Sequence, residues 1–326
     1  MTPAERRLWR AIQRRVVALT PTMNKAILDA FANIVALMSE TEMILALANA
    51  DTFAETVLTD ARMRQAFIGV RAEIARQTRE AALWFIPQLP QGGAVDGVLA
   101  VGFNILNPNV IEAIRKLDSR VMVSLRDDLR EGFRATVRQG LTEGVGSRTI
   151  ARRVRQSVGL APNQLQAVTN FHDALAGGDF TKALGYELRD KRFDATLKRL
   201  RAADGSLTAK QINTMTSAYR RKFIAWNAKT VARTAVNDAQ RLGKHLATQA
   251  AIDAGILDGS RMFSRWVNSG DSRVREEHQD APIGAGNTVV RFGEPFETGE
   301  VIPGEDSWNC RCIKVDFEAP RAVAAA

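Results

Sequence analysis

Both cysteines of the chain and one of its three histidines lie near the C-terminus. Cys310 and Cys312 are separated by a single residue, and His278 precedes them on the other side of a Gly/Pro-rich spacer. Thiolate sulfur and imidazole nitrogen are ligands that zinc prefers, in tetrahedral geometry. The three residues are therefore a candidate zinc site. The alternative is that two buried thiols pack a small β core beside a hydrogen-bonded histidine.

The cysteine spacing and the missing fourth ligand count against a metal. Asp271, Asp280 or a water molecule are the candidates for the fourth position. Structural zinc sites commonly place two or more residues between paired cysteines. On a strand, alternate side chains point the same way but at a wider spacing. Packing without metal is therefore favoured here, and a Cys310 nucleophile with His278 as its base stays an open alternative.

The residues around the candidate site are typical of structural turns. Asp271 follows Asn-Ser-Gly and is expected to accept backbone N–H groups, while Arg273 and Arg275 are expected to reach carboxylates. Asn309 is expected to fix a turn through its side-chain amide. The chain has no phosphate-binding loop, dinucleotide fingerprint, His-Glu-Xaa2-His or Gly-Xaa-Ser-Xaa-Gly motif. We therefore expect a protein that is not an enzyme.

Three short segments of alternating polarity surround these residues. They cover 261–267, which contains Trp266, then 288–292 and 312–317. Glycine and proline turns join them. The pattern predicts a small β-rich module with Trp266 in its core.

The rest of the chain has the periodicity of helices. Residues 4–88 predict several helices, with Pro21 at the first turn of the second. Residues 109–139 predict one long helix with Val121, Leu125, Leu129, Phe133 and Val137 on its buried stripe. Thr208 and Gln211 predict a capping box, and a further helix is expected over 230–254, where His245 is a packing or surface residue.

These patterns predict a mainly α fold, an elongated helical body with a small C-terminal α+β module of short strands. The expected division is an N-terminal helical region 1–108, a central helical body 109–256, the β-rich module 257–318 and a frayed tail 319–326. Dense proline and glycine between 87 and 108 suggest the first boundary.

The composition indicates a globular protein made in the cytoplasm. The chain has 326 residues, of which 45% are hydrophobic and 25% charged. No apolar run approaches the ~20 residues that span a bilayer, and no signal peptide is recognisable. Two cysteines do not make a disulfide framework.

The net charge of +9 is concentrated in the middle of the chain. Residues 182–233 hold 13 basic and 4 acidic side chains, including Arg220, Arg221 and Lys222. A ladder of Arg126, Arg130 and Arg134 follows one edge of the long helix. Either group could contact nucleic acid or an acidic protein. The alternative is a solvated face, or for the ladder a salt-bridged one, since Asp127, Asp128 and Glu131 lie nearby.

An ordered set of motifs spans residues 115–318. It consists of Gly144-Val-Gly-Ser147 before Ile-Ala-Arg, then Ala232-Arg233-Thr234, Trp266, Asp271-Ser-Arg273-Val-Arg275, His278, a phenylalanine-containing hairpin and Asn309-Cys310-Arg311-Cys312. This set resembles the phage head morphogenesis family, the Mu F-like and SPP1 gp7-like minor head proteins. The chain departs from that pattern after His278, where Gln279-Asp-Ala-Pro-Ile-Gly284 replaces the usual Leu-containing segment.

The resemblance implies a structural minor head protein of a phage or prophage. Its implied partners are portal, capsid and scaffold proteins, with double-stranded DNA as a further candidate and no membrane. Its implied place is the virion, in the head interior or at the portal vertex, after assembly in the host bacterial cytoplasm. A stand-alone DNA-binding protein is the main alternative, and an enzyme or toxin packaged in the virion is a weaker one.

Overall fold

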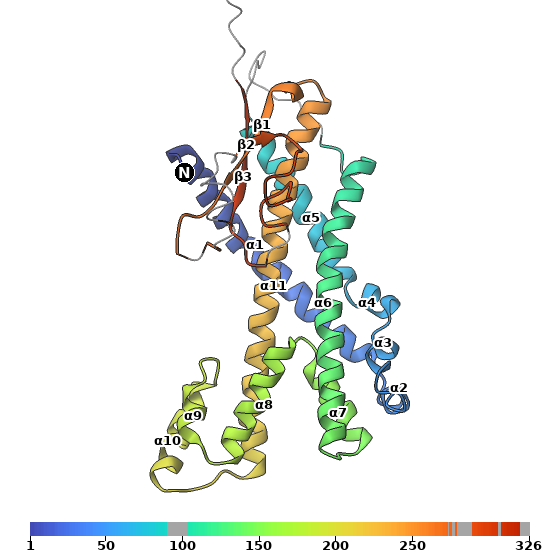
Figure 1. The fold of residues 1–326 in the computed structure, drawn as a ribbon, viewed down its shortest axis with the longest axis vertical. Helices are drawn as coiled ribbons and strands as arrows, with labels where there is room; N and C mark the ends of the chain where they lie inside the picture. The colour runs from blue at the N-terminus through green and yellow to red at the C-terminus, as the bar shows by residue number, and fades with distance from the viewer. Residues whose placement is uncertain (90–102, 273, 276–277, 279–288, 306–307, 320–326) are drawn as a thin grey trace, which may run out of the picture. The chain divides into compact units, whose positions relative to one another are not determined.

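The computed structural model confirms a mainly α protein with a small antiparallel sheet (Figure 1). It describes residues 1–89, 103–272, 274–275, 278, 289–305 and 308–319. The helices of the described residues are α1 (Pro3–Leu37), α2 (Glu40–Ala46), α3 (Phe53–Val57), α4 (Asp60–Ala66), α5 (Ile68–Phe85), α6 (Pro108–Thr142), α7 (Ser147–Ser157), α8 (Pro162–Ala176), α9 (Phe180–Gly185), α10 (Asp194–Ala202) and α11 (Ala209–Asp253), with short 3-10 turns at Ile86–Gln88, Lys191–Phe193 and Gly259–Arg261.

The chain forms two compact units, each assembled from segments that are distant in the sequence. Unit 1 comprises Met1–Lys25, Val70–Val121 and Val231–Ala326, and unit 2 comprises Ala26–Gly69 and Met122–Thr230. Neither unit coincides with one of the four linear ranges expected from the sequence. The β-rich module belongs to unit 1 together with the part of α1 up to Lys25 and the part of α11 from Val231 onward.

Pro21 lies inside α1 and does not begin a second helix, so that prediction was wrong. Buried Ile12, Val16 and Met23 line one stripe that continues past the proline. The Thr20 hydroxyl donates to the carbonyl of Val16 at 2.6 Å. The apolar stripe therefore maintains the helix although proline removes one backbone donor.

The helix α11 is also longer than expected, because it runs without a break through Trp226. It begins as the capping box predicted: the Thr208 N–H donates to Gln211 Oε1 at 2.8 Å, and the Gln211 N–H donates to Thr208 Oγ1 at 3.3 Å. Further along, Gly243 lets α5 approach closely. A Cβ atom at this position would lie 2.5 Å from the Cβ of Ala81.

The sheet has the order β2-β1-β3, with both pairs antiparallel. Its strands are β1 (Met262–Val267), β2 (Val289–Arg291) and β3 (Ile313–Glu318), which confirms the three predicted strands to within a few residues. Trp266 is paired with Lys314 across β1 and β3. Figure 1 shows the sheet beside the C-terminal part of α11, to which it is joined by the buried contact of Lys244 with Asp316.

Unit 2 has its own core, built where α8, α9, α10 and the first part of α11 meet. Phe171, Tyr186, Tyr219 and Phe223 form an aromatic cluster with ring centroids 4.4 to 5.6 Å apart. Burial of the ring cluster raises the pKa of Tyr219 to about 12, because the charged phenolate would lose its hydration. The part of α6 from Met122 onward and the whole of α7 belong to the same unit.

Candidate metal centre

His278, Cys310 and Cys312 come together in the module, and all three are buried. The Nδ1 atom of His278 lies 3.5 Å from Cys310 Sγ and 3.7 Å from Cys312 Sγ. The three ligand atoms all lie within 4.8 Å of one another, a spacing that one metal ion can bridge. Trp266 closes one side of the cluster, with its ring centroid 5.2 Å from that of His278. The predicted grouping of these residues is confirmed.

The cysteines do not lie on a strand, which corrects the geometric objection drawn from their spacing. The residues from Cys310 to Cys312 form a loop that ends where β3 begins at Ile313. Asn309, before it, has a positive φ of 58°, which asparagine tolerates better than most residues. The Cys312 N–H donates to Cys310 Sγ at 3.4 Å, and both sulfurs lie within 3.7 Å of His278 Nδ1.

One cysteine of the pair is poised to be a thiolate. A hydrogen bond with the Cys312 thiol lowers the pKa of Cys310 to about 5; burial opposes this shift and the positive charge of Arg241 favours it. The same hydrogen bond and burial raise the pKa of Cys312. Because the thiolate is the form that binds metals, Cys310 is ready to act as a ligand at neutral pH.

The Ala232-Arg233-Thr234 segment of α11 contacts the cysteine loop directly. Arg233 Nη2 donates to Asn309 Oδ1 at 2.6 Å, and the Asn309 N–H donates to Thr234 Oγ1 at 3.1 Å. The side-chain amide of Asn309 therefore fixes the loop, as predicted, but does so by binding the helix. Asn309 thus contacts Thr234 and Arg233, which precede it in the sequence by 75 and 76 residues.

The Asp271 to Arg275 turn clamps the same loop from another side. Asp271 forms a bidentate ion pair with Arg311, at 2.8 and 2.7 Å, instead of binding only backbone groups. Arg275 Nη2 donates to the carbonyl of Trp308 at 2.6 Å, and it contacts no carboxylate among the residues that the structure describes. Arg273 and Asp280 lie outside the described residues. Since Asp271 is committed to Arg311, it is a poor fourth ligand.

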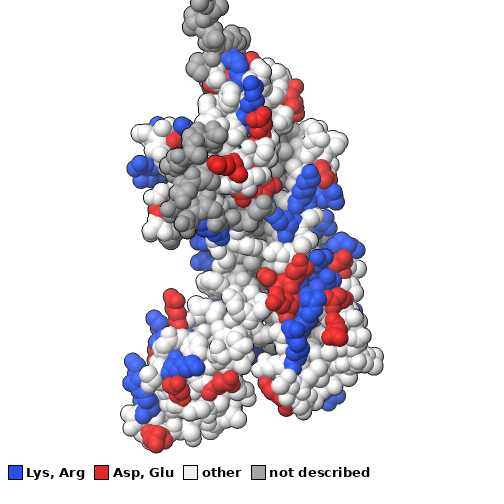
Figure 2. Space-filling view, in the orientation of Figure 1, with Lys and Arg blue, Asp and Glu red and all other residues white. Residues whose placement is uncertain are grey.

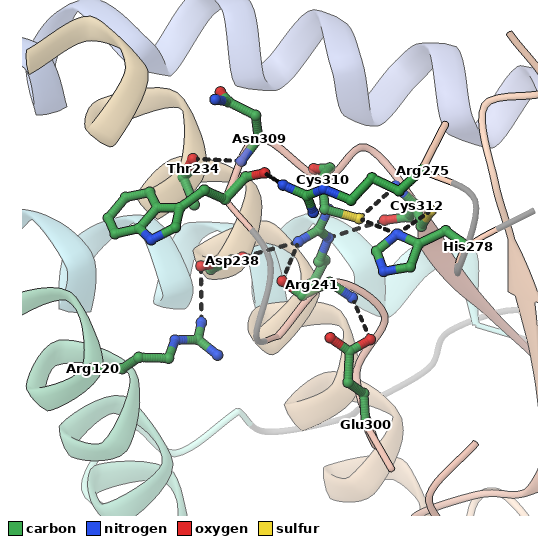
Figure 3. A network of polar contacts seen from close by, with 12 residues as sticks. Arg120, Thr234, Asp238, Arg241, Arg275, His278, Glu300, Asn309, Cys310 and Cys312 are labelled. Carbon is green, nitrogen blue, oxygen red and sulfur yellow. Dashed lines mark hydrogen bonds and ion pairs between the residues drawn. The ribbon is translucent and has the colours of Figure 1, made fainter. Parts of the chain in front are cut away.

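Arg241 is the central support of the loop, and the sequence did not single it out (Figure 3). Its Nε donates to the carbonyl of Cys312 at 3.0 Å, its Nη2 donates to the carbonyl of Cys310 at 2.5 Å, and its Nη1 pairs with Asp238 at 2.9 Å. Burial raises the pKa of Asp238 to about 6, although Arg241 and Arg120 both favour its ionised form. The available sequence signal was the polar run Asn237-Asp238-Ala-Gln240-Arg241 in a helix that is otherwise rich in alanine.

A second buried charged cluster joins β3 to α11. Asp316 contacts Lys244, and its Oδ1 accepts from Ser264 at 2.8 Å. Burial opposes ionisation of Asp316, but Lys244 and Lys314 hold its pKa well below the usual range. His245 stacks on Phe292 with centroids 4.8 Å apart, which agrees with its expected packing role.

The arginine ladder of α6 is occupied by partners within unit 2. Arg126 and Arg130 lie 3.3 and 3.4 Å from Asp60, Arg130 also donates to the carbonyl of Leu58 at 2.8 Å, and Arg134 pairs with Glu55. Figure 2 shows basic and acidic side chains interleaved over the face where α6 lies in Figure 1. The salt-bridged alternative therefore describes this face, and contacts of the ladder with nucleic acid stay a prediction.

The basic triplet on α11 does not act as one patch. Arg220 is half-buried and donates to Gln156 Oε1 at 2.9 Å, whereas Arg221 is exposed. Lys222 donates to the carbonyl of Arg189 at 3.1 Å. The three side chains thus have different surroundings.

No family model, curated protein or solved structure matches this chain. None of the described helices combines the length and apolarity that a membrane span requires.

Proposed function

We propose that this chain is a structural minor head protein of the phage head morphogenesis family. The observation that supports the proposal is the convergence on one loop of the family-like motifs from Ala232 onward, all of which belong to unit 1. Arg233 and Thr234 bind Asn309, Asp271 binds Arg311, Arg275 binds Trp308, and His278 faces both cysteines. Motifs that are far apart in the sequence are expected to occur together in a family when their side chains contact one another in one structural module.

The same contacts favour a structural role over an enzymatic one. Most of the motif side chains are used in binding the loop, and the two cysteines are buried. In this proposal the module is a rigid element with which the protein joins portal, capsid and scaffold proteins in the virion. A stand-alone DNA-binding protein receives less support, because Arg126, Arg130 and Arg134 already have partners within the chain.

Co-expression with the portal, scaffold and capsid proteins encoded beside it tests the assembly role. The chain should co-sediment with proheads in substoichiometric amounts, and Asp271→Ala, which removes the clamp on Arg311, should reduce its recovery there. Arg221→Gln, an exposed change in the other unit, should not. Complete, infectious particles formed without the chain, which stays in the soluble fraction, would contradict the proposal.

We propose further that the His278, Cys310 and Cys312 cluster holds zinc. Zinc bonds of about 2.3 Å to sulfur and about 2.0 Å to nitrogen, at tetrahedral angles, separate the two ligand atoms by about 3.5 Å. The two sulfur-to-Nδ1 distances are 3.5 and 3.7 Å. A cavity of about 110 Å³ beside the three residues has room for a water molecule as the fourth ligand.

Metal analysis of the purified protein tests the zinc site. We expect about one zinc per chain, and Cys310→Ser or His278→Ala should release it and lower the melting temperature together. His172→Ala is the matched control, since His172 is a partly exposed histidine of the other unit. If no metal is found and a chelator leaves the melting temperature unchanged, the cysteines are packing residues.

A further inference from the structure

Unit 2 contains a polar pocket of about 600 Å³, and Arg152, the arginine of the Ile-Ala-Arg motif, is among the residues that line it. Residues of α6, α7, α8 and α11 line it, and hydrophilic side chains predominate among them. Its volume falls within the usual range for small-molecule sites, but such sites are mostly apolar. A hydrophilic ligand would therefore fit this pocket better than an apolar one.

The basic side chains of the pocket outnumber their acidic partners. Arg153 is paired with Glu143 at 2.5 Å, and Asp173 contacts His172 at 3.2 Å. Arg220 contacts an amide oxygen only, that of Gln156, at 2.9 Å. Arg152, exposed at the pocket, makes no hydrogen bond or ion pair with the residues that the structure describes. Two guanidinium groups thus face the pocket without a carboxylate partner among the described residues.

A buried hydroxyl in the same pocket also lacks a partner. Thr216 is 5% exposed, and its Oγ1 atom makes no hydrogen bond with any described residue. Buried hydroxyl groups are nearly always hydrogen-bonded, so an unpaired one requires an explanation. Thr216 precedes Arg220 by one helical turn, which places both side chains on the same face of α11. A ligand that accepts hydrogen bonds would satisfy both.

We propose that this pocket binds a phosphate group. A phosphate monoester carries a charge of about −1.5 to −2 at neutral pH, which compensates two guanidinium groups, and its oxygens accept hydrogen bonds from several directions. Arginine is the side chain best suited to this ligand, and the Thr216 hydroxyl supplies a neutral donor beside it. The remaining volume admits the sugar and base of a nucleotide. The proposal concerns unit 2 and does not depend on the proposed head-assembly role.

Calorimetric titration at low salt tests the proposal with inorganic phosphate, thymidine monophosphate and thymidine. We expect the two phosphate-containing ligands to bind and thymidine not to bind. Arg220→Gln should weaken binding by about tenfold or more, since it removes a charge-assisted hydrogen bond. Arg152→Gln and Thr216→Val should each weaken it several-fold. The matched control is Arg221→Gln, which removes the same charge from the next, exposed position and should change the affinity by less than about twofold.

A short DNA duplex at equal phosphate concentration identifies the source of the phosphate group. Duplex binding that depends on Arg220 while the free ligands fail would still support the proposal, with the DNA backbone as the source. Circular dichroism establishes that each variant is folded. If Arg220→Gln does not fold, Arg152→Gln, at an exposed position, replaces it in the test. Equal losses in Arg220→Gln and Arg221→Gln would overturn the proposal. Absence of binding by all three phosphate-containing ligands (inorganic phosphate, thymidine monophosphate and the duplex) would also overturn the proposal, as would Arg220-dependent binding of an acidic peptide alone.

Discussion

Arg241 joins the last helix to the cysteine loop through several polar contacts. Its guanidinium is buried and binds two backbone carbonyls of the cysteine loop as well as Asp238. Arginine suits this position because its five donors have a fixed planar arrangement, which a lysine does not provide. The loop therefore depends on a helix residue that is distant from it in the sequence.

Replacing Arg241 by methionine should strongly destabilise unit 1. The change leaves the carbonyls of Cys310 and Cys312 without the Arg241 donor. It also removes one of the two arginines that contact Asp238, the other being Arg120. Breaking a buried ion pair in this way costs about 3 to 5 kcal/mol. Urea unfolding measures the loss. Arg221→Met on the same helix is the control and should change stability by less than about 0.5 kcal/mol. A similar small effect for Arg241→Met would show that the loop has other support.

The sequence predicted the site residues better than it predicted their partners. His278, Cys310 and Cys312 stood out because cysteine and histidine are rare in this chain. The turn pattern did not identify Arg311 as a partner of Asp271 or the Trp308 carbonyl as a partner of Arg275, because such a pattern does not specify which distant loop it faces. Arg241 was missed because a polar residue on a long helix is usually solvated, and its burial results from contacts that only the folded chain provides.

At the scale of elements, periodicity was sufficient for the strands and the long helix of 109–139. Alternating polarity located β1, β2 and β3, and the buried stripe of α6 is confirmed from Val121 to Val137. Local signals were weaker guides to where helices end. Pro21 is compatible with either a helix start or a helix interior, and tertiary packing decided between them.

Gly243→Ala tests the close contact between α11 and α5. Within a helix this change normally stabilises by about 0.5 to 1 kcal/mol. Here the added Cβ would lie 2.5 Å from the Cβ of Ala81 and 2.6 Å from the carbonyl oxygen of Thr78, so we expect destabilisation of about 1 to 3 kcal/mol. Gly69→Ala, with nothing within 4 Å of its added Cβ, should stabilise. Thermal unfolding of both variants checks the two opposite signs.

The contact between α1 and α5 should depend on pH through Glu73. Hydrogen bonds from Arg76, Thr22 and Gln77 lower the pKa of Glu73 from 4.5 to about 2. Since the pKa is lower in the folded protein than in the unfolded chain, this carboxylate stabilises the fold above about pH 4.5, and the contribution is lost as the pH falls toward about 2. Glu73→Gln should therefore flatten the loss of stability over that interval. Chemical unfolding at several pH values measures it, and an unchanged slope would contradict the assignment.

At the scale of the whole molecule, the start and the end of the chain belong to the same unit. Trp9 Nε1 on α1 donates to the carbonyl of Arg311 at 2.9 Å, and Glu5 pairs with Arg265 on β1. The linear division placed these segments in separate regions, because composition changes along a sequence do not report contacts between its distant parts. We therefore expect unit 1 to unfold cooperatively.

Trp266→Ala provides the test of that expectation. The side chain is 3% exposed and packs on His278 and Phe296, so its truncation should cost about 3 to 5 kcal/mol. Hydrogen exchange should then accelerate in β1 and β3 and also in the first part of α1 and in α5, which belong to the same cooperative unit.

Leu197→Ala, in the core of unit 2, is the reciprocal variant and should accelerate exchange in α8, α9 and α10. If Trp266→Ala changes exchange only within residues 257–318, the module unfolds independently and the linear division describes the chain better. Acceleration that reaches α1 and α5 would instead establish that the cysteine loop is stabilised by the first helix as well as by the last, because both contribute side chains to it.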